Sequence, residues 1–401
     1  FIKGAGGYSN LEVLAEHGGN SLRTWDTQNA QEILDRAHDL GLTVTLGLEV
    51  GSQWWRDDID YTNPKEVDKK IEEIKNIVLK YKNHPALLMW GVGNEVHLFQ
   101  GNDTGLWVTI NRIAKMIHQV DPNHPTMTAL SIKTFREKHE MIKFKLICTN
   151  IDVLAVNPFG EIETVFADIY NSTFGMKTWD GPFLISEWGT DGPWETPRTS
   201  WRVPIEPNST EMAEKIIRYY QNTIQKDSGR CIGSYAFYLG ERYERTHTFF
   251  SLMNAAGDKT PSMNALQYLW TGKYPDNLAP VVHGVQIGQK ASDTGYILCA
   301  GKMYNASVLA SDPDQDTLYY QWEIRKEGLS NNRAALYNYP LEGSILHPDD
   351  IKTAFTAPLE EGAYRLMVHI YDHKKHVTHA NIPVYVLSEC TNGFDLHHID
   401  R

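Results

Sequence analysis

Short apolar segments alternate with helical patterns from residue 1 to about residue 272. Such alternation is typical of βαβ units that assemble a parallel sheet. The segments predicted to be strands are 1–5, 21–25, 43–49, 86–91, 126–129, 152–156, 183–187 and 232–238. Eight parallel strands suit a closed barrel, so we predict an α/β fold in which residues 1–272 form a (β/α)8 TIM barrel.

The clearest helical pattern begins at residue 63. Asn63 is a candidate N-cap, Pro64 takes the first helical position, and apolar residues then recur at helical spacing. Similar stripes run through 110–120 and 212–224, the second after a candidate cap at Ser209. Each stripe predicts a helix whose apolar face packs on the sheet.

Beyond residue 272 the pattern changes. Residues 273–280 are rich in turn formers, which predicts a linker. From 281 to 389, short segments such as 318–324 and 364–371 alternate apolar and polar residues, as half-buried antiparallel strands do. We therefore predict a smaller all-β domain of the immunoglobulin-like sandwich type, followed by a tail at 390–401.

The composition is that of an ordinary globular protein. Of the 401 residues, 41% are hydrophobic and 22% are charged, which is enough apolar material for a large interior. A formal net charge of -12 without a run of Lys and Arg argues against a nucleic-acid partner. No apolar stretch reaches the about 18 residues of a membrane span. A neutral ligand fits these properties better.

Two predicted strands end in a glutamate. Trp90-Gly-Val-Gly-Asn-Glu95 ends the fourth strand, and Leu184-Ile-Ser-Glu187 ends the seventh. The active site of a barrel lies at the carboxyl ends of its strands. Cleavage of a glycosidic bond with retention needs a proton donor and an attacking carboxylate about 5 to 5.5 Å apart. Glu95 and Glu187 are therefore candidate catalytic residues of a retaining β-glycosidase, a reaction that needs no cofactor.

Several motifs, in order, resemble the catalytic domain of glycoside hydrolase family 2 in clan A, over roughly residues 1–270. Residues 18–25 (GGNSLRTW) and 37–44 (AHDLGLTV) are similar to that family's run from an Asn-x-x-Arg strand to a Gly-Leu-x-Val strand. Residues 90–95 (WGVGNE) match its W-x-x-G-N-E pattern, and 186–189 (SEWG) match its nucleophile strand.

The resemblance implies a role for each matching residue. Glu95 is the general acid/base, Glu187 the nucleophile, Asn94 a donor to the sugar 2-hydroxyl, and Arg23 a residue beneath the nucleophile. A guanidinium near Glu187 favours its ionised form. Repulsion from Glu187 favours the protonated form of Glu95.

The sequence departs from the family's pattern at two strands. Phe159 follows the sixth strand, where family members usually place a Tyr that hydrogen-bonds the nucleophile. The eighth strand offers Tyr235, Phe237 and Tyr238 in place of the usual Trp.

Other side chains that follow predicted strand ends are candidates for substrate contact. Aromatic faces stack on the C–H faces of sugars, but core packing is the preferred interpretation of any single aromatic residue. For Trp54 and Trp55, substrate contact and packing under a long loop are weighed equally. We predict that His97 is a polar wall of the site and not a metal ligand. With Arg23 and Asn94, the candidates are Trp25, Asp26, Glu49, Trp54, Trp55, His97, Asn157, Trp188, Trp194 and Tyr238.

The sequence indicates no strong metal site. The four cysteines, Cys148, Cys231, Cys299 and Cys390, form no CxxC pair, and their disulfide pairing stays open. In the second domain Asp312, Asp314 and Asp316 stand at alternate positions, a spacing that can offer oxygens to calcium. That segment resembles linkers of cadherin-like and polycystic-kidney-disease-type sandwiches, and a plain acidic turn is the preferred interpretation.

Two other functions stay open. A β-glucan transglycosylase would use the same two glutamates with a sugar as acceptor, and residues near Trp25 and Asp26 also resemble fungal β-1,3-glucanosyltransferases. A non-catalytic carbohydrate-binding protein is the further alternative. A β-linked neutral hexose, such as a glucan, is the expected substrate, and a secreted, periplasmic or cell-surface location is expected from it. No oligomeric state is predicted.

Overall fold

The computed structural model describes residues 1–51, 59–100, 104–132, 135–170, 172–173, 176–227, 229–288, 295–328 and 339–390. These residues form two compact units. The barrel unit comprises Phe1–Gly189 and Arg218–Leu239, and the second unit comprises Thr190–Ile217 and Gly240–Arg401. The segment 190–217 therefore groups with the C-terminal part of the chain, and the domain boundaries at 272 and 281 stay predictions.

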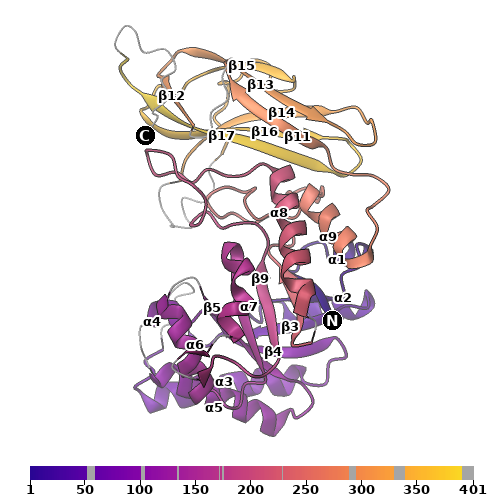
Figure 1. The fold of residues 1–401 in the computed structure, drawn as a ribbon, viewed down its shortest axis with the longest axis vertical. Coiled ribbons are helices and arrows are strands. Elements are labelled where there is room, and N and C mark those ends of the chain that lie inside the picture. The colour runs from indigo at the N-terminus through magenta and orange to yellow at the C-terminus, as the bar shows by residue number, and fades with distance from the viewer. Residues whose placement is uncertain are drawn as a thin grey trace. The chain divides into compact units, whose positions relative to one another are not determined.

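Eight parallel strands close the barrel, and this confirms the predicted fold of the N-terminal part (Figure 1). Their order around the barrel is β1-β10-β9-β6-β5-β4-β3-β2. Pairing of the first strand with the last, as at Ile2 and Gly233, closes the ring. The strands are β1 (Ile2–Gly6), β2 (Ser21–Arg23), β3 (Thr43–Leu48), β4 (Leu87–Asn94), β5 (Thr126–Ser131), β6 (Val153–Asn157), β9 (Phe183–Trp188) and β10 (Cys231–Ala236).

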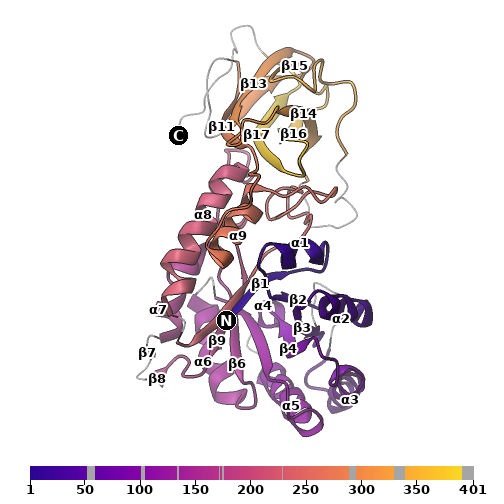
Figure 2. The same cartoon turned by 90° about the vertical axis from the view of Figure 1, so that its right-hand side faces the viewer.

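Helices cover the outside of the barrel, and Figure 2 shows α2, α3 and α5 following one another around it. Asn63 caps α3 as predicted, because its side chain accepts the N–H of Lys65 at 3.2 Å. The helices of this part are α1 (Leu11–Glu16), α2 (Ala30–Asp39), α3 (Pro64–Tyr81), α4 (His97–Gln100), α5 (Thr104–Val120), α6 (Phe135–Ile147) and α7 (Val165–Tyr170). Short 3-10 turns lie at Phe159–Glu163 and Ile224–Asp227, and β7 (Ser172–Thr173) pairs with β8 (Met176–Lys177).

The predicted cap of the next helix, α8 (Ser209–Asn222), is wrong by one residue. The side chain of Asn208 accepts the N–H groups of Thr210 at 2.9 Å and Glu211 at 3.1 Å, so Asn208 is the cap. The Ser209 hydroxyl instead accepts the N–H of His379 at 2.9 Å. Both residues are good caps by type, and only the start of the helix decides between them.

Side chains fill the interior of the barrel below the strand ends. Tyr235 is fully buried there, and its hydroxyl lies 2.8 Å from Ser21 Oγ and 2.6 Å from Thr45 Oγ1. Burial raises the pKa of Tyr235, so the hydroxyl stays neutral. Gly4 gives the ring its space, because a Cβ at that position would lie 2.4 Å from a ring carbon of Tyr235.

The second unit contains an all-β part, as predicted, together with α9 (Pro261–Thr271). A three-stranded sheet has the order β11-β13-β15, and a four-stranded sheet has the order β12-β17-β16-β14. Both contribute to one apolar core that includes Val308, Phe355, Trp322 and Val368. The immunoglobulin-like class stays a prediction. The strands are β11 (Val281–Ile287), β12 (Tyr296–Cys299), β13 (Met303–Ser311), β14 (Tyr319–Lys326), β15 (Lys352–Thr356), β16 (Gly362–Tyr371) and β17 (Val377–Leu387).

Both faces of β16 are buried. Leu366, Val368 and Ile370 point into the apolar core, whereas Arg365 and His369 lie on the opposite face and are also buried. The predicted half-exposed alternation therefore holds for polarity but not for exposure. The buried polar face carries a network of ion pairs, because charged groups inside a protein need partners.

One disulfide links Cys299 to Cys390, whereas Cys148 and Cys231 are buried thiols outside it. Burial raises the pKa of Cys148 to about 12, which makes this thiol a poor nucleophile. Among the described residues, no helix is both long and apolar enough to cross a membrane.

Candidate functional site

Glu187 lies at the carboxyl end of β9 and is held by two donors. Its Oε1 accepts an N–H from Arg23 Nη1 at 3.0 Å and the indole N–H of Trp25 at 2.7 Å. Only 6% of Glu187 and 1% of Arg23 are exposed. A charged donor and a neutral donor therefore converge on one oxygen of Glu187.

Arg23 connects Glu187 to the neighbouring strand ends. Its Nη1 also donates to the carbonyl oxygen of Ser186 at 2.8 Å, and its Nη2 donates to Asn94 Oδ1 at 2.6 Å. Burial lowers the pKa of Arg23, and the negative charges of Glu187 and Glu95 act in the opposite direction. A guanidinium titrates far above neutral pH, so Arg23 remains a cation in this site.

Glu95 follows β4 directly and has a left-handed backbone, with φ of 51°. Asn157, at the end of β6, donates from Nδ2 to Glu95 Oε1 at 3.0 Å. The orientation of this amide is fixed, since its Oδ1 accepts the hydroxyl of Ser186 at 2.6 Å. A left-handed conformation costs a non-glycine residue about 1–2 kcal/mol. Such a cost is characteristic of functional positions.

These contacts join the two glutamates in one hydrogen-bonded network. Asn94 Oδ1 accepts from both Arg23 Nη2 and Asn157 Nδ2, the latter at 3.2 Å. The path therefore runs from Glu187 through Arg23, Asn94 and Asn157 to Glu95, along the carboxyl ends of β9, β2, β4 and β6. Residues that are far apart in sequence meet here because the barrel is closed.

An aromatic wall adjoins Glu187. Trp25 stacks on Tyr238 with ring centroids 5.8 Å apart and planes 20° apart, and it meets the edge of Phe237 at 5.7 Å. Phe159 packs against Phe237 at 5.6 Å. Trp25 and Tyr238 are partly exposed, so they remain suited to substrate contact. The donation from Trp25 to Glu187 was not predicted. It supplies a hydrogen bond to the carboxylate in a barrel where Phe159 has no hydroxyl.

Three further candidates from the sequence stand at strand ends with other contacts. Asp26 accepts the N–H of Gln28 at 2.8 Å and so closes a turn. Glu49 follows β3 and is exposed. His97 is buried, with Nε2 3.2 Å from the carbonyl oxygen of Ser131 and its ring stacked on Trp107. The predicted Trp54 and Trp55 lie outside the described residues.

Two predicted tryptophans are placed elsewhere. Trp188 is fully buried and packs on Tyr220 of α8 at 5.7 Å. This strand has an irregular register between Ile185 and Trp188. The predicted contact of Trp188 with a substrate stays a prediction. Trp194 belongs to the second unit, where it packs on Phe250 at 5.9 Å.

The calcium candidates are only partly brought together. Asp312 and Asp316 group with Asp372, and their oxygens lie within 4.8 Å of one another. Asp314 is not in that group, because it accepts the N–H of Leu278 at 2.7 Å. Asp316 Oδ1 is paired with Lys374 at 2.5 Å, so this oxygen already has a cationic partner. The acidic-turn interpretation stays a prediction.

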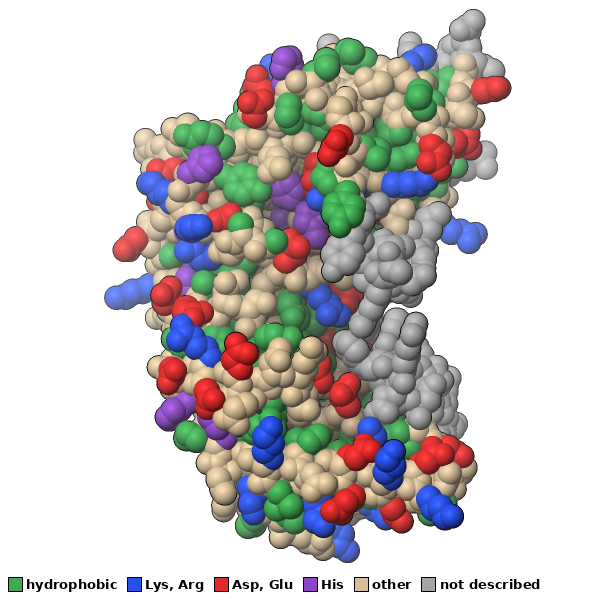
Figure 3. Space-filling view, turned by 180° about the vertical axis from the view of Figure 1, so that it is seen from behind, with side chains coloured by type: hydrophobic (Ala, Val, Ile, Leu, Met, Phe, Trp, Pro, Cys, Tyr) green, Lys and Arg blue, Asp and Glu red, His purple; other side chains and the backbone are tan. Residues whose placement is uncertain are grey.

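Figure 3 shows one face of the molecule, on which Lys and Arg side chains are interspersed with Asp and Glu. No basic patch is visible among the described side chains of that face.

Comparisons with known proteins point in the same direction as the geometry. Residues 8–256 match the family model described as Glycosyl hydrolases family 2, TIM barrel domain. A β-glucuronidase of Streptococcus agalactiae is 24% identical over 219 residues, which is 48% of this chain and 35% of the relative. A β-galactosidase of Thermoanaerobacter pseudethanolicus is 33% identical over 115 residues, which is 28% of this chain and 13% of the relative. The chain thus spans well under half of each relative.

Solved structures show the same fold. A β-D-glucuronidase of Dictyoglomus thermophilum superposes with a TM-score of 0.50 at 18% identity, covering 69% of this chain and 51% of that chain. A β-galacturonidase of Eisenbergiella tayi superposes with a TM-score of 0.50 at 17% identity, covering 68% of this chain and 51% of that chain.

Proposed function

Because this chain belongs to glycoside hydrolase family 2, we propose that it is a retaining β-glycosidase with Glu187 as nucleophile and Glu95 as general acid/base. The observation that carries the proposal is the network that joins the two glutamates at the barrel mouth. It holds Glu187 against a cation through Arg23, whereas Glu95 faces the neutral amide of Asn157. This asymmetry suits one carboxylate for attack and the other for proton transfer.

In the first step Glu187 attacks the anomeric carbon. A bond forms between the carboxylate oxygen and that carbon, and the bond to the leaving oxygen breaks. Glu95 gives its proton to the leaving oxygen, so that no alkoxide is released. Once Glu187 is esterified, its negative charge is gone, and Glu95 is then more easily ionised.

In the second step a water molecule attacks the glycosyl–enzyme ester. Glu95, now a carboxylate, accepts a proton from the water, and Glu187 leaves as a carboxylate again. Arg23 and Trp25 stabilise that leaving carboxylate through the same two hydrogen bonds that hold it before reaction. Two inversions at one carbon give overall retention.

Asn94 is oriented for a role in substrate binding. Its Oδ1 accepts from both Arg23 and Asn157, so its NH2 group is the part left to face the substrate. A hydrogen bond from this amide N–H to the sugar 2-hydroxyl would become stronger as charge develops in the transition state.

The partly exposed rings of Trp25 and Tyr238 support a hexose as the bound sugar, because aromatic faces stack on sugar C–H groups. The similar proteins include a glucuronidase, a galactosidase and a galacturonidase. We therefore include uronic acids beside neutral hexoses such as β-glucan among the proposed substrates. A secreted, periplasmic or cell-surface location is proposed with this substrate class.

The test is a panel of aryl β-glycosides carrying glucose, galactose, glucuronic acid or galacturonic acid, with product analysis by mass spectrometry. The wild type should release aglycone from at least one, whereas Glu187→Ala and Glu95→Ala should be inactive with unchanged circular dichroism. Azide should restore turnover to Glu187→Ala and give a glycosyl azide of inverted configuration. Glu73→Gln on the exposed side of α3 is the control and should remain active. Full activity in either alanine variant would refute the assignment.

A further inference from the structure

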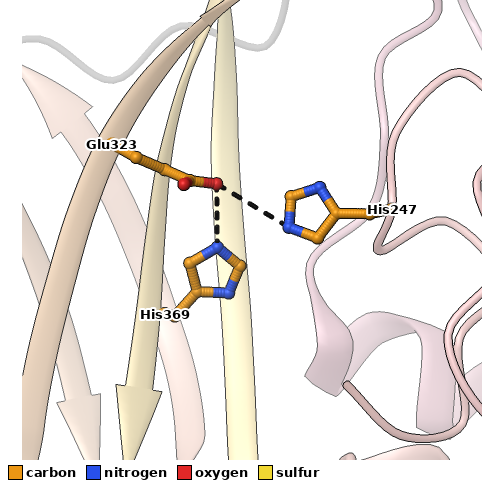
Figure 4. A group of neighbouring side chains, drawn as sticks. All are labelled: His247, Glu323 and His369. Carbon is orange, nitrogen blue, oxygen red and sulfur yellow. Dashed lines mark hydrogen bonds and ion pairs between the residues drawn. The ribbon is translucent and has the colours of Figure 1, made fainter. Parts of the chain in front are cut away.

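Three side chains of the second unit converge at a place that the proposed glycosidase reaction does not use (Figure 4). Glu323 comes from β14, His369 from β16, and His247 from the segment between β10 and α9. In the antiparallel pair β14–β16, Gln321 stands opposite His369 and Glu323 opposite Met367. Glu323 and His369 are therefore diagonal neighbours on one face of the sheet.

Both imidazoles turn the same nitrogen toward the same oxygen. His369 Nε2 lies 3.1 Å from Glu323 Oε1, and His247 Nε2 lies 3.7 Å from it. The three ligand atoms all lie within 4.8 Å of one another. Ligands bound to zinc at about 2.1 Å in tetrahedral geometry stand about 3.4 Å apart. The two printed spacings, 3.1 and 3.7 Å, bracket that value.

The surroundings of the cluster fix the carboxylate. Arg325 Nε donates to Glu323 Oε1 at 2.8 Å, and its Nη2 donates to Oε2 at 2.9 Å. In many metal sites, hydrogen-bond partners of this kind orient the carboxylate that binds the metal. The side chains of Glu323, His369 and His247 are 6%, 11% and 14% exposed, so the cluster is largely enclosed.

We propose that His247, Glu323 and His369 bind one divalent transition-metal ion, of the class of Zn²⁺ or Co²⁺. Two imidazole nitrogens and one carboxylate oxygen are ligands that these ions prefer. The ion takes the place of the hydrogen bond between His369 and Glu323, so His369 would bind it through an Nε2 that carries no hydrogen. The bound ion clamps the segment that carries His247 to the β14–β16 pair.

The experiment uses the full chain, stripped of metal by a chelator that is then removed. Co²⁺ is added while visible absorption is recorded, and Zn²⁺ binding is measured by calorimetry. We expect one ion per chain and the d–d bands of nitrogen- and oxygen-ligated Co²⁺. Zn²⁺ should also raise the melting temperature. His247→Ala should bind both ions at least 100-fold more weakly, because it removes one of three ligands.

His247→Ala is the informative variant, since it keeps the Arg325–Glu323–His369 contacts that hold β14 to β16. His118→Ala is the matched control. His118 also pairs with a carboxylate, Asp152 at 2.9 Å, but it is 35% exposed and lies in the barrel unit. The control should bind as the wild type does. Absence of stoichiometric binding by the wild type, or equal binding by His247→Ala, would overturn the proposal.

Discussion

Arg23 in the barrel unit and Arg365 in the second unit are both almost fully buried, with 1% and 2% of each exposed. Each also forms an ion pair with a glutamate: Arg23 Nη1 lies 3.0 Å from Glu187, and Arg365 Nε lies 2.6 Å from Glu327. Burial and pairing are therefore the same in the two places. What differs is the set of other groups that each arginine contacts.

Arg365 joins segments of the second unit. It donates to the carbonyl oxygen of Pro204 at 2.8 Å and to the side chain of Asn381, and Glu206 lies 3.7 Å away. These partners are enclosed and belong to three separate stretches of chain. Arg23, by contrast, lies at the carboxyl ends of barrel strands beside Asn94 and Glu95, which are partly exposed. A buried ion pair alone does not mark a site. A buried ion pair indicates a candidate active site when it lies at the carboxyl ends of barrel strands, next to groups that solvent reaches.

The sharpest test of this difference is Glu187→Gln. The amide keeps the shape of the side chain and its contacts with Arg23 and Trp25 in part, but it cannot attack carbon. We expect activity on the best aryl glycoside to fall by about 10⁴-fold or more. The melting temperature should stay within a few degrees of the wild type, and a variant that unfolds instead would show that this pair is structural.

Arg365→Met should give the opposite result. Removing the guanidinium leaves the carboxylates of Glu327 and Glu206 buried without their cation, which costs about 3–5 kcal/mol of unfolding free energy. Urea unfolding followed by fluorescence measures this loss. The activity of the folded fraction should remain that of the wild type. A stability change below about 1 kcal/mol would contradict a structural role for Arg365.

Trp25→Phe examines one hydrogen bond to Glu187, the proposed nucleophile. The ring stack on Tyr238 is kept, but the N–H that Glu187 accepts at 2.7 Å is lost. A hydrogen bond to a charged group contributes about 1.5–3 kcal/mol, so kcat should fall roughly 10- to 100-fold. Trp90→Phe is the matched control, because it removes another buried indole N–H from a carboxylate, that of Asp121 at 2.8 Å. Equal losses of kcat in both variants would remove any special role for Trp25.

Glu206→Gln should change stability the least of these variants, and the change in melting temperature should depend on pH. Burial raises the pKa of Glu206 above its unfolded value, while the charge of Arg365 acts against this. A carboxyl whose folded pKa is raised contributes stability below its unfolded pKa, near 4.3, and loses it as pH rises through the folded value. The melting temperature of the variant relative to the wild type should therefore rise between pH 4.5 and pH 7. A difference that stays constant over this range would contradict the raised pKa.

Much of the barrel could be predicted from sequence because strand and helix patterns are local. Apolar runs identified all eight strands, and the position of Glu95 and Glu187 directly after two of them followed from the same runs.

Other features depend on tertiary contacts that no local pattern contains. The indole of Trp25 reaches Glu187 only because β2 and β9 close into one ring. The cluster of His247, Glu323 and His369 depends on the register of β14 against β16, and on a segment more than 70 residues earlier in the chain. The choice between Asn208 and Ser209 as a cap depends on where α8 begins.

The central claim is that Glu187 forms a covalent bond to the sugar while Glu95 transfers the proton. The most direct measurement is proton NMR of the reaction mixture in its first minutes, with the aryl β-glycoside that the wild type hydrolyses fastest. Retention predicts that the β-anomer of the free sugar appears first and the α-anomer only later, by mutarotation. If the α-anomer appears first, water attacks the anomeric carbon directly, and the double displacement through Glu187 is wrong.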